Sequence, residues 1–155
     1  MWKITALVFD SFAVGICSFC SLQASAMTQL LNDGKSDEAI VPHFRAIIPR
    51  AAKLMMFTMT GGAVANVLAF HASHHKEWNF LLAAGCDLFI LLFSFSVLSP
   101  AMKNMFTDKP NVKETIPTFA KLQTFRGLAS AGAFGLALLS FCPDIHIFTA
   151  TTARM

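Results

Sequence analysis

Three polar side chains stand inside long apolar stretches of this chain and could carry proton or ion chemistry. Asp10, Asn66 and Asp87 each interrupt a different apolar stretch. A charge near the centre of a bilayer costs about 2.5–3.5 kcal/mol on insertion scales, so these side chains should face protein or water. Asn66 and Asp87 are expected at similar depths, which allows a hydrogen bond between them. Two interpretations stay open: Asp10 and Asp87 form a proton or ion site, or these side chains simply join helices.

Cys17 and Cys20 form a Cys-x-x-Cys pattern within the first apolar stretch. A redox dithiol needs a helix N-terminus or a cation that favours the thiolate, and the neighbouring sequence supplies neither. Cysteine otherwise packs as a small apolar residue. We therefore expect these two residues to serve packing, with redox chemistry as the alternative.

Histidines gather near the expected turn between the second and third apolar stretches. His71 with His74 or His75 has a spacing that could hold a metal on one helix face. His146, Cys142 and Asp144 fall on the same expected side. A solvated turn at headgroup level is the favoured interpretation, and a metal site the alternative. We predict no metal and no cofactor.

The composition indicates a protein that lies in a lipid bilayer. Of 155 residues, 55% are hydrophobic and only 14% are charged, whereas an average globular chain is about 25% charged. The charges gather into short segments between apolar stretches. This pattern excludes a disordered chain, a nucleic-acid-binding protein and an ordinary soluble enzyme. The length fits one domain.

Four stretches are long enough to cross a bilayer, since a helical span needs roughly 20 apolar residues. They are 4–31, 49–71, 78–100 and 119–142. Pro49 and Pro117 are expected in first helical turns, where the missing N–H costs nothing, and Pro100 at a helix end. No stretch shows the alternation of a barrel strand. We predict an all-α, integral membrane four-helix bundle, a single membrane domain over 1–155. Its helices run antiparallel, up-down-up-down, with both termini on the same side.

The distribution of basic residues predicts the orientation. Of the 12 Lys and Arg residues, all but Lys3, Lys76 and Arg154 fall on the side of the connections 32–48 and 101–118. The positive-inside rule then places these long basic loops on the inner side. We expect a multi-pass protein of an organelle membrane, such as the mitochondrial inner membrane, or of an endomembrane.

Small residues recur along two of the stretches. Gly127, Ala131 and Gly135 lie four residues apart, and Gly61 with Gly62 makes a second notch. Such stripes let helix backbones approach closely in lipid. They predict close packing, either within the bundle or against another membrane protein.

Three segments carry a resemblance to a known family. The chain resembles the anthrone oxygenase-like family of small four-helix membrane proteins in 44–53, 98–104 and 119–126. The resemblance implies cofactor-independent oxidation of a polycyclic anthrone to an anthraquinone. It also implies His43 as the base, Asn104 and Arg126 as donors to the developing oxyanion, and an apolar cavity lined by all three.

Three functions follow as hypotheses. The first is a structural or accessory subunit that packs with other membrane protein subunits, as in an energy-converting membrane. The alternative is the oxygenase-like enzyme, which acts on an apolar small molecule. The third is a proton-linked carrier that uses Asp10 and Asp87. The lipid bilayer is the expected partner in every case, and nucleic acid in none.

Overall fold

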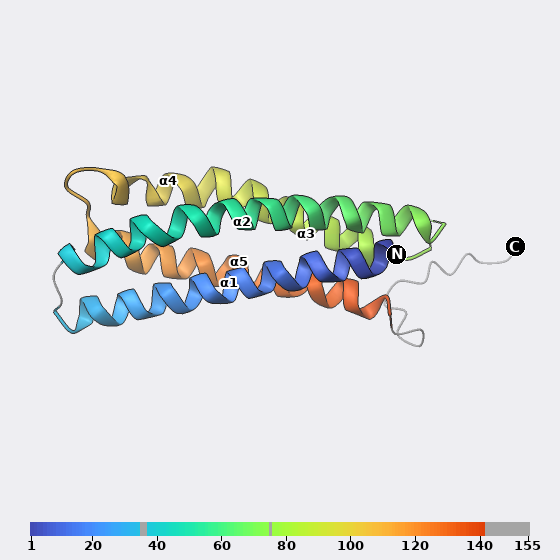
Figure 1. Ribbon diagram of the computed structural model, residues 1–155, viewed down its shortest axis with the longest axis horizontal. Helices are drawn as coiled ribbons and strands as arrows, with labels where there is room; N and C mark the ends of the chain where they lie inside the picture. Colours follow the sequence, from blue (N-terminus) through green and yellow to red (C-terminus); the bar gives the residue numbers. More distant parts are fainter. Residues whose placement is uncertain (35–36, 75, 142–155) are drawn as a thin grey trace, which may run out of the picture.

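The computed structural model describes residues 1–34, 37–74 and 76–141, apart from the side chain of Asp37, and these residues form helices without any strand. Four long helices make up most of the structure (Figure 1). They are α1 (Trp2–Asn32), α2 (Asp37–Ala72), α3 (Trp78–Phe93) and α5 (Val112–Leu139). Three short segments connect α3 to α5: the π-helical η1 (Ser94–Leu98), α4 (Ser99–Met102) and the 3-10 helix η2 (Lys103–Phe106).

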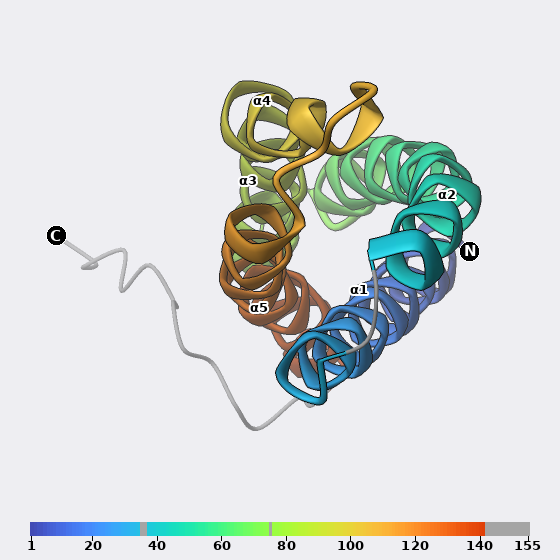
Figure 2. The ribbon, with the colours of Figure 1, turned by 90° about the vertical axis from the view of Figure 1, so that its left-hand side faces the viewer.

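The four long helices surround a common interior. α1 packs against α2 and α5, and α3 packs against the same two helices from the other side, as Figure 2 shows from one end of the bundle. Figure 1 shows consecutive long helices running in opposite directions. We call the end that holds Met1, the α2–α3 turn and Leu139 the N-terminal end. The opposite end, which holds Asn32, Asp37 and η2, is the loop end.

Three helical stretches are long and apolar enough to cross a membrane: Trp2–Asn32, Glu38–Ala72 and Trp78–Phe106. The chain therefore has the helices of a membrane protein. α5 does not join this set, although 119–142 was predicted as a fourth apolar span. Gln123, Arg126 and many small residues lower its hydropathy, and the predicted end at Cys142 lies outside the described residues. Gln123, Arg126 and Ser130 of this helix are buried in the bundle interior.

α2 begins at Asp37 rather than at residue 49, and most of the predicted 32–48 loop is therefore helix. Pro42 and Pro49 lie inside α2, at a cost of about 3 kcal/mol for a proline in a helix interior. The compensation is burial, because Ile40, Phe44 and Ile48 recur every four residues and are at most 4% exposed. Each such side chain contributes about 1.5–3 kcal/mol when buried.

α5 also begins earlier than expected, at Val112, with Pro117 inside it. The added turns pack into the core through three buried side chains, those of Val112, Ile116 and Phe119. At 1.5 Å per residue, Arg126 then lies about 21 Å along the helix from Val112. It is a residue of the middle of α5, not of its beginning.

The third stretch does not end at Pro100, as predicted, but continues in a changed hydrogen-bond register. The N–H of Ser99 donates to the carbonyl of Ser94, the spacing of a π-helix. Pro100 follows in the first turn of α4, where its lack of an N–H is tolerated. Helical structure then extends to Phe106. The π-helical turn thus places Ser94 within the long helical path.

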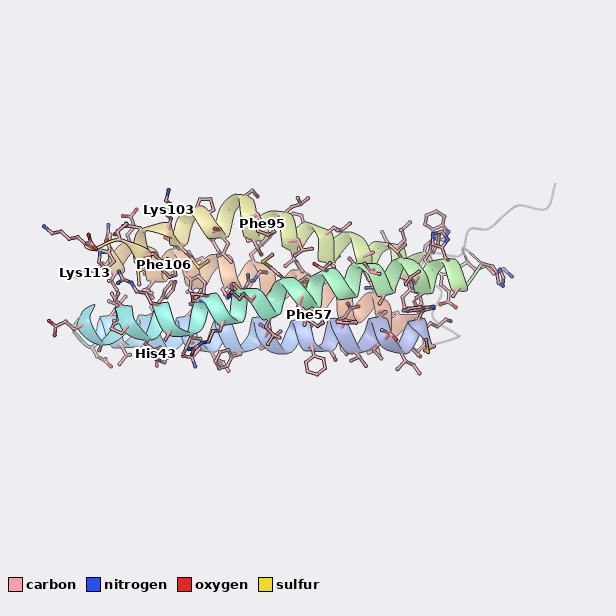
Figure 3. All side chains as sticks on the ribbon, turned by 45° about the horizontal axis from the view of Figure 1, so that its top comes forward. His43, Phe57, Phe95, Lys103, Phe106 and Lys113 are labelled. Carbon is pink, nitrogen blue, oxygen red and sulfur yellow. The ribbon has the colours of Figure 1, made fainter. Side chains whose placement is uncertain are left out.

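Apolar clusters close both ends of the interior. The loop end holds a cluster that includes Phe44, Leu98 and Phe119, in which the Phe44 and Phe119 rings lie 5.3 Å apart. The N-terminal end holds Ala6, Ala65, Ala69, Phe70, Phe80 and Ala137. Large apolar side chains such as Phe57 and Phe95 also cover the outside (Figure 3), which suits a surface that faces lipid.

Candidate functional site: a buried carboxyl pair

Asp10 of α1, Asn66 of α2 and Asp87 of α3 meet inside the bundle. All three are at most 1% exposed. Asn66 Nδ2 lies 3.2 Å from Asp10 Oδ2 and 3.2 Å from Asp87 Oδ2, so one amide group donates to both carboxyl groups. The hydrogen bond expected between Asn66 and Asp87 is confirmed, and Asp10 joins the same contact.

Gly62 lets the two carboxyl groups lie against the backbone of α2. A Cβ added at this position would stand 2.8 Å from Asp10 Oδ1 and 2.8 Å from Asp87 Oδ2, which is closer than real Cβ contacts come. Gly61 has a related role, because a Cβ there would overlap the Phe9 ring of α1. The sequence indicated these glycines as a packing notch. The structure shows that Gly62 makes room for the carboxyl pair.

No cation of the described residues lies beside the carboxyl pair. Each carboxyl lies within hydrogen-bonding reach of the other, and no Lys, Arg or His of the described residues interacts with either. Asp87 Oδ1 and Asn66 Oδ1 are buried and have no hydrogen-bond partner among the described residues. Two carboxylates this close in a low-dielectric interior repel each other strongly. A shared proton removes the repulsion and supplies a donor to the pair, as in other close carboxyl pairs.

A second buried polar group lies closer to the loop end, around Arg126. Its Nη1 donates to Ser94 Oγ at 3.3 Å, and its guanidinium interacts with the thiols of Cys17 and Cys20. Cys17 Sγ lies 3.1 Å from Ser130 Oγ. A cation near the two cysteines was not predicted from the sequence, because Arg126 is remote from them in the chain. Both cysteines are free thiols buried among helices.

The three residues that the family resemblance suggested do not form one site. His43 is exposed on α2 (Figure 3) and its Nε2 lies 2.9 Å from Gln23 Oε1 of α1. Asn104 is exposed in η2, where its carbonyl accepts a hydrogen bond from Thr107 Oγ1. Arg126 is 5% exposed. His43 lies on an exposed face of α2, whereas Arg126 shares the buried face of α5 with Gln123 and Ser130.

An apolar groove lies elsewhere, between α1 and α2. Its volume is about 590 Å³, and Phe12, Phe19, Arg50 and Leu54 are among its lining residues. Neither His43, Asn104 nor Arg126 lines it. The predicted cavity lined by these three residues therefore does not correspond to this groove.

The stripe Gly127, Ala131 and Gly135 faces away from the bundle interior. A Cβ at Gly135 would meet nothing within 4 Å, and one at Gly127 would reach only Ser21 Oγ at 3.9 Å. Ala131 is exposed. The buried face of α5 is formed instead by Gln123, Arg126, Ser130, Ala133 and Ala137. Of the two packing alternatives, the stripe does not serve packing within the bundle.

The histidines at the α2–α3 turn do not make a metal centre within residues 1–34, 37–74 and 76–141, where no group of three metal-binding side chains occurs. His74 has a φ of 54°, the left-handed conformation that ends α2. His75, Cys142, Asp144 and His146 lie outside the described residues.

No family model, no curated protein and no solved structure matches this chain.

Proposed function

We propose that this chain is a four-span membrane protein that binds and releases a proton at the Asp10–Asp87 pair, the chemistry of a proton-linked carrier. One observation carries the proposal: both carboxyl groups approach a single amide, that of Asn66, inside the bundle. Ionisable residues within membrane helices characteristically mark ion or proton pathways.

The choice of two acids supports a function beyond joining helices. An Asn or Ser at either position would also form hydrogen bonds between helices, without the cost of a buried ionisable group. Two carboxyl groups with one amide donor add the capacity to gain and lose a proton. This capacity is what a carrier couples to the movement of its substrate.

α5 is proposed to cross the membrane with the other three long helices, because it packs along α1 and α3. Its buried polar residues face those helices rather than lipid. Under the positive-inside rule the loop end, with Arg45, Lys103, Lys109 and Lys113, lies on the inner side and Met1 on the outer side. Figure 3 shows Lys103 and Lys113 projecting from the loop end.

The apolar clusters at both ends of the bundle separate the carboxyl pair from either surface. Proton exchange with one side therefore requires that helices shift at one of these clusters. The proposal favours opening at the N-terminal end, where alanines make up most of the buried cluster. Alanine side chains bury less apolar surface per residue than the Phe, Leu and Ile side chains of the loop-end cluster.

Proton movement in reconstituted vesicles tests the proposal. The purified protein is placed in liposomes that contain a pH-sensitive dye, and a pH step is applied outside. Wild-type vesicles should equilibrate faster than empty ones, and Asp87→Asn should remove the increase. Asp108→Asn, which changes an exposed acid at the loop end, is the matched control and should behave as the wild type. Equal rates for the wild type and Asp87→Asn would refute the carrier.

A second function, as a subunit of a larger membrane assembly, is favoured by the outward stripe of α5. Gly127, Ala131 and Gly135 offer a flat surface that another helix could approach closely. The two functions are compatible. A carrier of four helices is small, and assembly with further copies or subunits would enlarge it.

A further inference from the structure

Arg126 is a buried cation without a carboxylate partner. It is 5% exposed, and among the described residues its Nη1 donates a hydrogen bond to Ser94 Oγ. Its Nε has no acceptor among residues 1–34, 37–74 and 76–141. Within the described part of the chain no Asp or Glu oxygen pairs with it, since Lys3 and Glu77 make the one ion pair there. An arginine does not lose its proton in a protein, so its charge calls for an acceptor.

Gln123 lies beside Arg126 and likewise lacks hydrogen-bond partners among the described residues. It is 0% exposed, and neither its Nε2 nor its Oε1 has a hydrogen-bond partner in the part of the chain that the structure describes. The two residues are three positions apart on α5 and share its buried face. Buried polar groups in proteins are nearly always hydrogen-bonded, so these two side chains need partners that the described protein atoms do not supply.

The neighbouring polar groups do not supply what these two side chains lack. The hydroxyl of Ser94 donates to the carbonyl of Ile90 at 2.7 Å, so it accepts from Arg126 but has no hydrogen left for another group. Cys17 Sγ and Ser130 Oγ form a hydrogen bond with each other. A neutral thiol does not compensate a guanidinium charge. The open groups are therefore the N–H of Arg126 Nε, the NH₂ of Gln123 and the carbonyl of Gln123.

We propose that Arg126 and Gln123 bind a small oxyanion inside the bundle. The Nε of Arg126 and the Nε2 of Gln123 donate to its oxygens, which makes a charge-assisted contact with the guanidinium. An oxyanion that retains an O–H, such as dihydrogen phosphate, also donates to Gln123 Oε1 and satisfies every open group. The site is separate from the Asp10–Asp87 pair, and the proposal does not depend on proton transport.

Thermal unfolding in detergent, followed by the fluorescence of Trp2 and Trp78, tests the site with inorganic phosphate as the probe. Chloride and gluconate at equal ionic strength are the reference salts. A ligand that binds the folded state raises Tm by an amount that grows with the logarithm of its concentration above Kd, and phosphate should raise Tm beyond both references. Arg126→Gln should weaken the apparent affinity about tenfold to a hundredfold, the usual effect of losing a charged hydrogen bond. Lys53→Gln, which removes an exposed cation of α2, should leave it unchanged.

Further variants keep the test decisive. If Arg126→Gln fails to fold, Gln123→Leu decides, because it removes the amide while retaining an apolar side chain of similar size. It should weaken phosphate binding about tenfold. The double variant Cys17→Ala and Cys20→Ala should retain binding, which excludes a thiolate as the partner of Arg126. Equal Tm changes in all three salts, or binding that is unchanged in Gln123→Leu, would overturn the proposal and leave water as the partner of these groups.

Discussion

Asp10 and Asp87 meet over the backbone of Gly62, where one oxygen of each lies 2.8 Å from the position that a Cβ would occupy. Three helices therefore contribute to one contact: α1 and α3 each supply a carboxyl group, and α2 supplies the space and the amide of Asn66. Any side chain at Gly62 must displace both carboxyl groups at once. This arrangement makes the site sensitive to a single methyl group.

Gly62→Ala should destabilise the bundle by about 1–3 kcal/mol, because overpacking a well-filled interior forces its neighbours to move. The free energy of unfolding in mixed detergent micelles measures the effect. Gly132→Ala is the matched control on α5, since a Cβ there meets nothing within 4 Å. It should be neutral or slightly stabilising, as alanine favours helix over glycine by about 1 kcal/mol. Equal losses in both variants would show that the carboxyl contact does not constrain Gly62.

Asn66→Leu should cost about 1–3 kcal/mol, because it leaves two buried carboxyl groups without their common donor. The same unfolding measurement applies. Thr60→Leu, a polar-to-apolar change at an exposed position of α2, should stay within about 0.5 kcal/mol of the wild type. If the free energy of unfolding of Asn66→Leu equalled that of the wild type, the amide of Asn66 would not stabilise the carboxyl pair.

Phe44→Ala tests whether α2 begins at Asp37. Phe44 is 0% exposed and packs against Phe119, so its truncation should cost about 3–5 kcal/mol. Phe95→Ala removes the same atoms from a side chain that is 57% exposed and should cost much less in a lipid-like micelle. If residues 37–48 formed a loop outside the core, the two variants would behave alike.

Cysteine labelling tests the direction of the helices in the membrane. In a background with the four native cysteines (Cys17, Cys20, Cys86 and Cys142) replaced by alanine, Asp33→Cys and Lys109→Cys should react with an impermeant maleimide from one side of a sealed vesicle. Lys76→Cys should react from the other side. Labelling of Lys76→Cys and Lys109→Cys from the same side would contradict the alternating arrangement across the membrane.

Gly135→Leu tests the outward stripe of α5. A Cβ there meets nothing within 4 Å, so the folded monomer should tolerate leucine, and its Tm at low protein concentration should stay unchanged. If a second helix packs on the stripe, the larger side chain should weaken association in mild detergent, as measured by analytical ultracentrifugation. Leu128→Ala, at an exposed position of the same helix, is the control. An unchanged association state would remove the support for the subunit function.

The sequence predicted the helical class and the grouping of Asp10, Asn66 and Asp87, because a polar residue in an apolar stretch is easy to recognise. Counting from the short α2–α3 turn was enough to set Asn66 level with Asp87. The beginnings of α2 and α5 could not be found in the same way. Pro49 and Pro117 suggested first turns, and only tertiary burial of residues such as Phe44 and Ile116 explains why the helices continue through them.

The surroundings of Arg126 could not be predicted either. Its depth in the bundle depends on where α5 begins. Its neighbours Cys17 and Ser94 belong to other helices, and the rotation of those helices about their own axes could not be predicted from the sequence. α5 illustrates the difficulty, since its small-residue stripe looked like the packing face, yet Gln123, Arg126 and Ser130 are the buried side chains. In a bundle with an apolar exterior, polar residues mark the inner face better than small ones do.

Infrared spectroscopy of the carboxyl groups tests the central claim most directly. Carboxylates do not absorb in the C=O stretching region of carboxylic acids, so a band there at neutral pH reports a carboxyl group that keeps its proton. The wild type should show this band, Asp87→Asn should lose it or shift it, and the double variant with Asp10→Asn should lack it, while Asp108→Asn should match the wild type. A wild-type spectrum without the band, or a band that survives in the double variant, would contradict a proton held between Asp10 and Asp87.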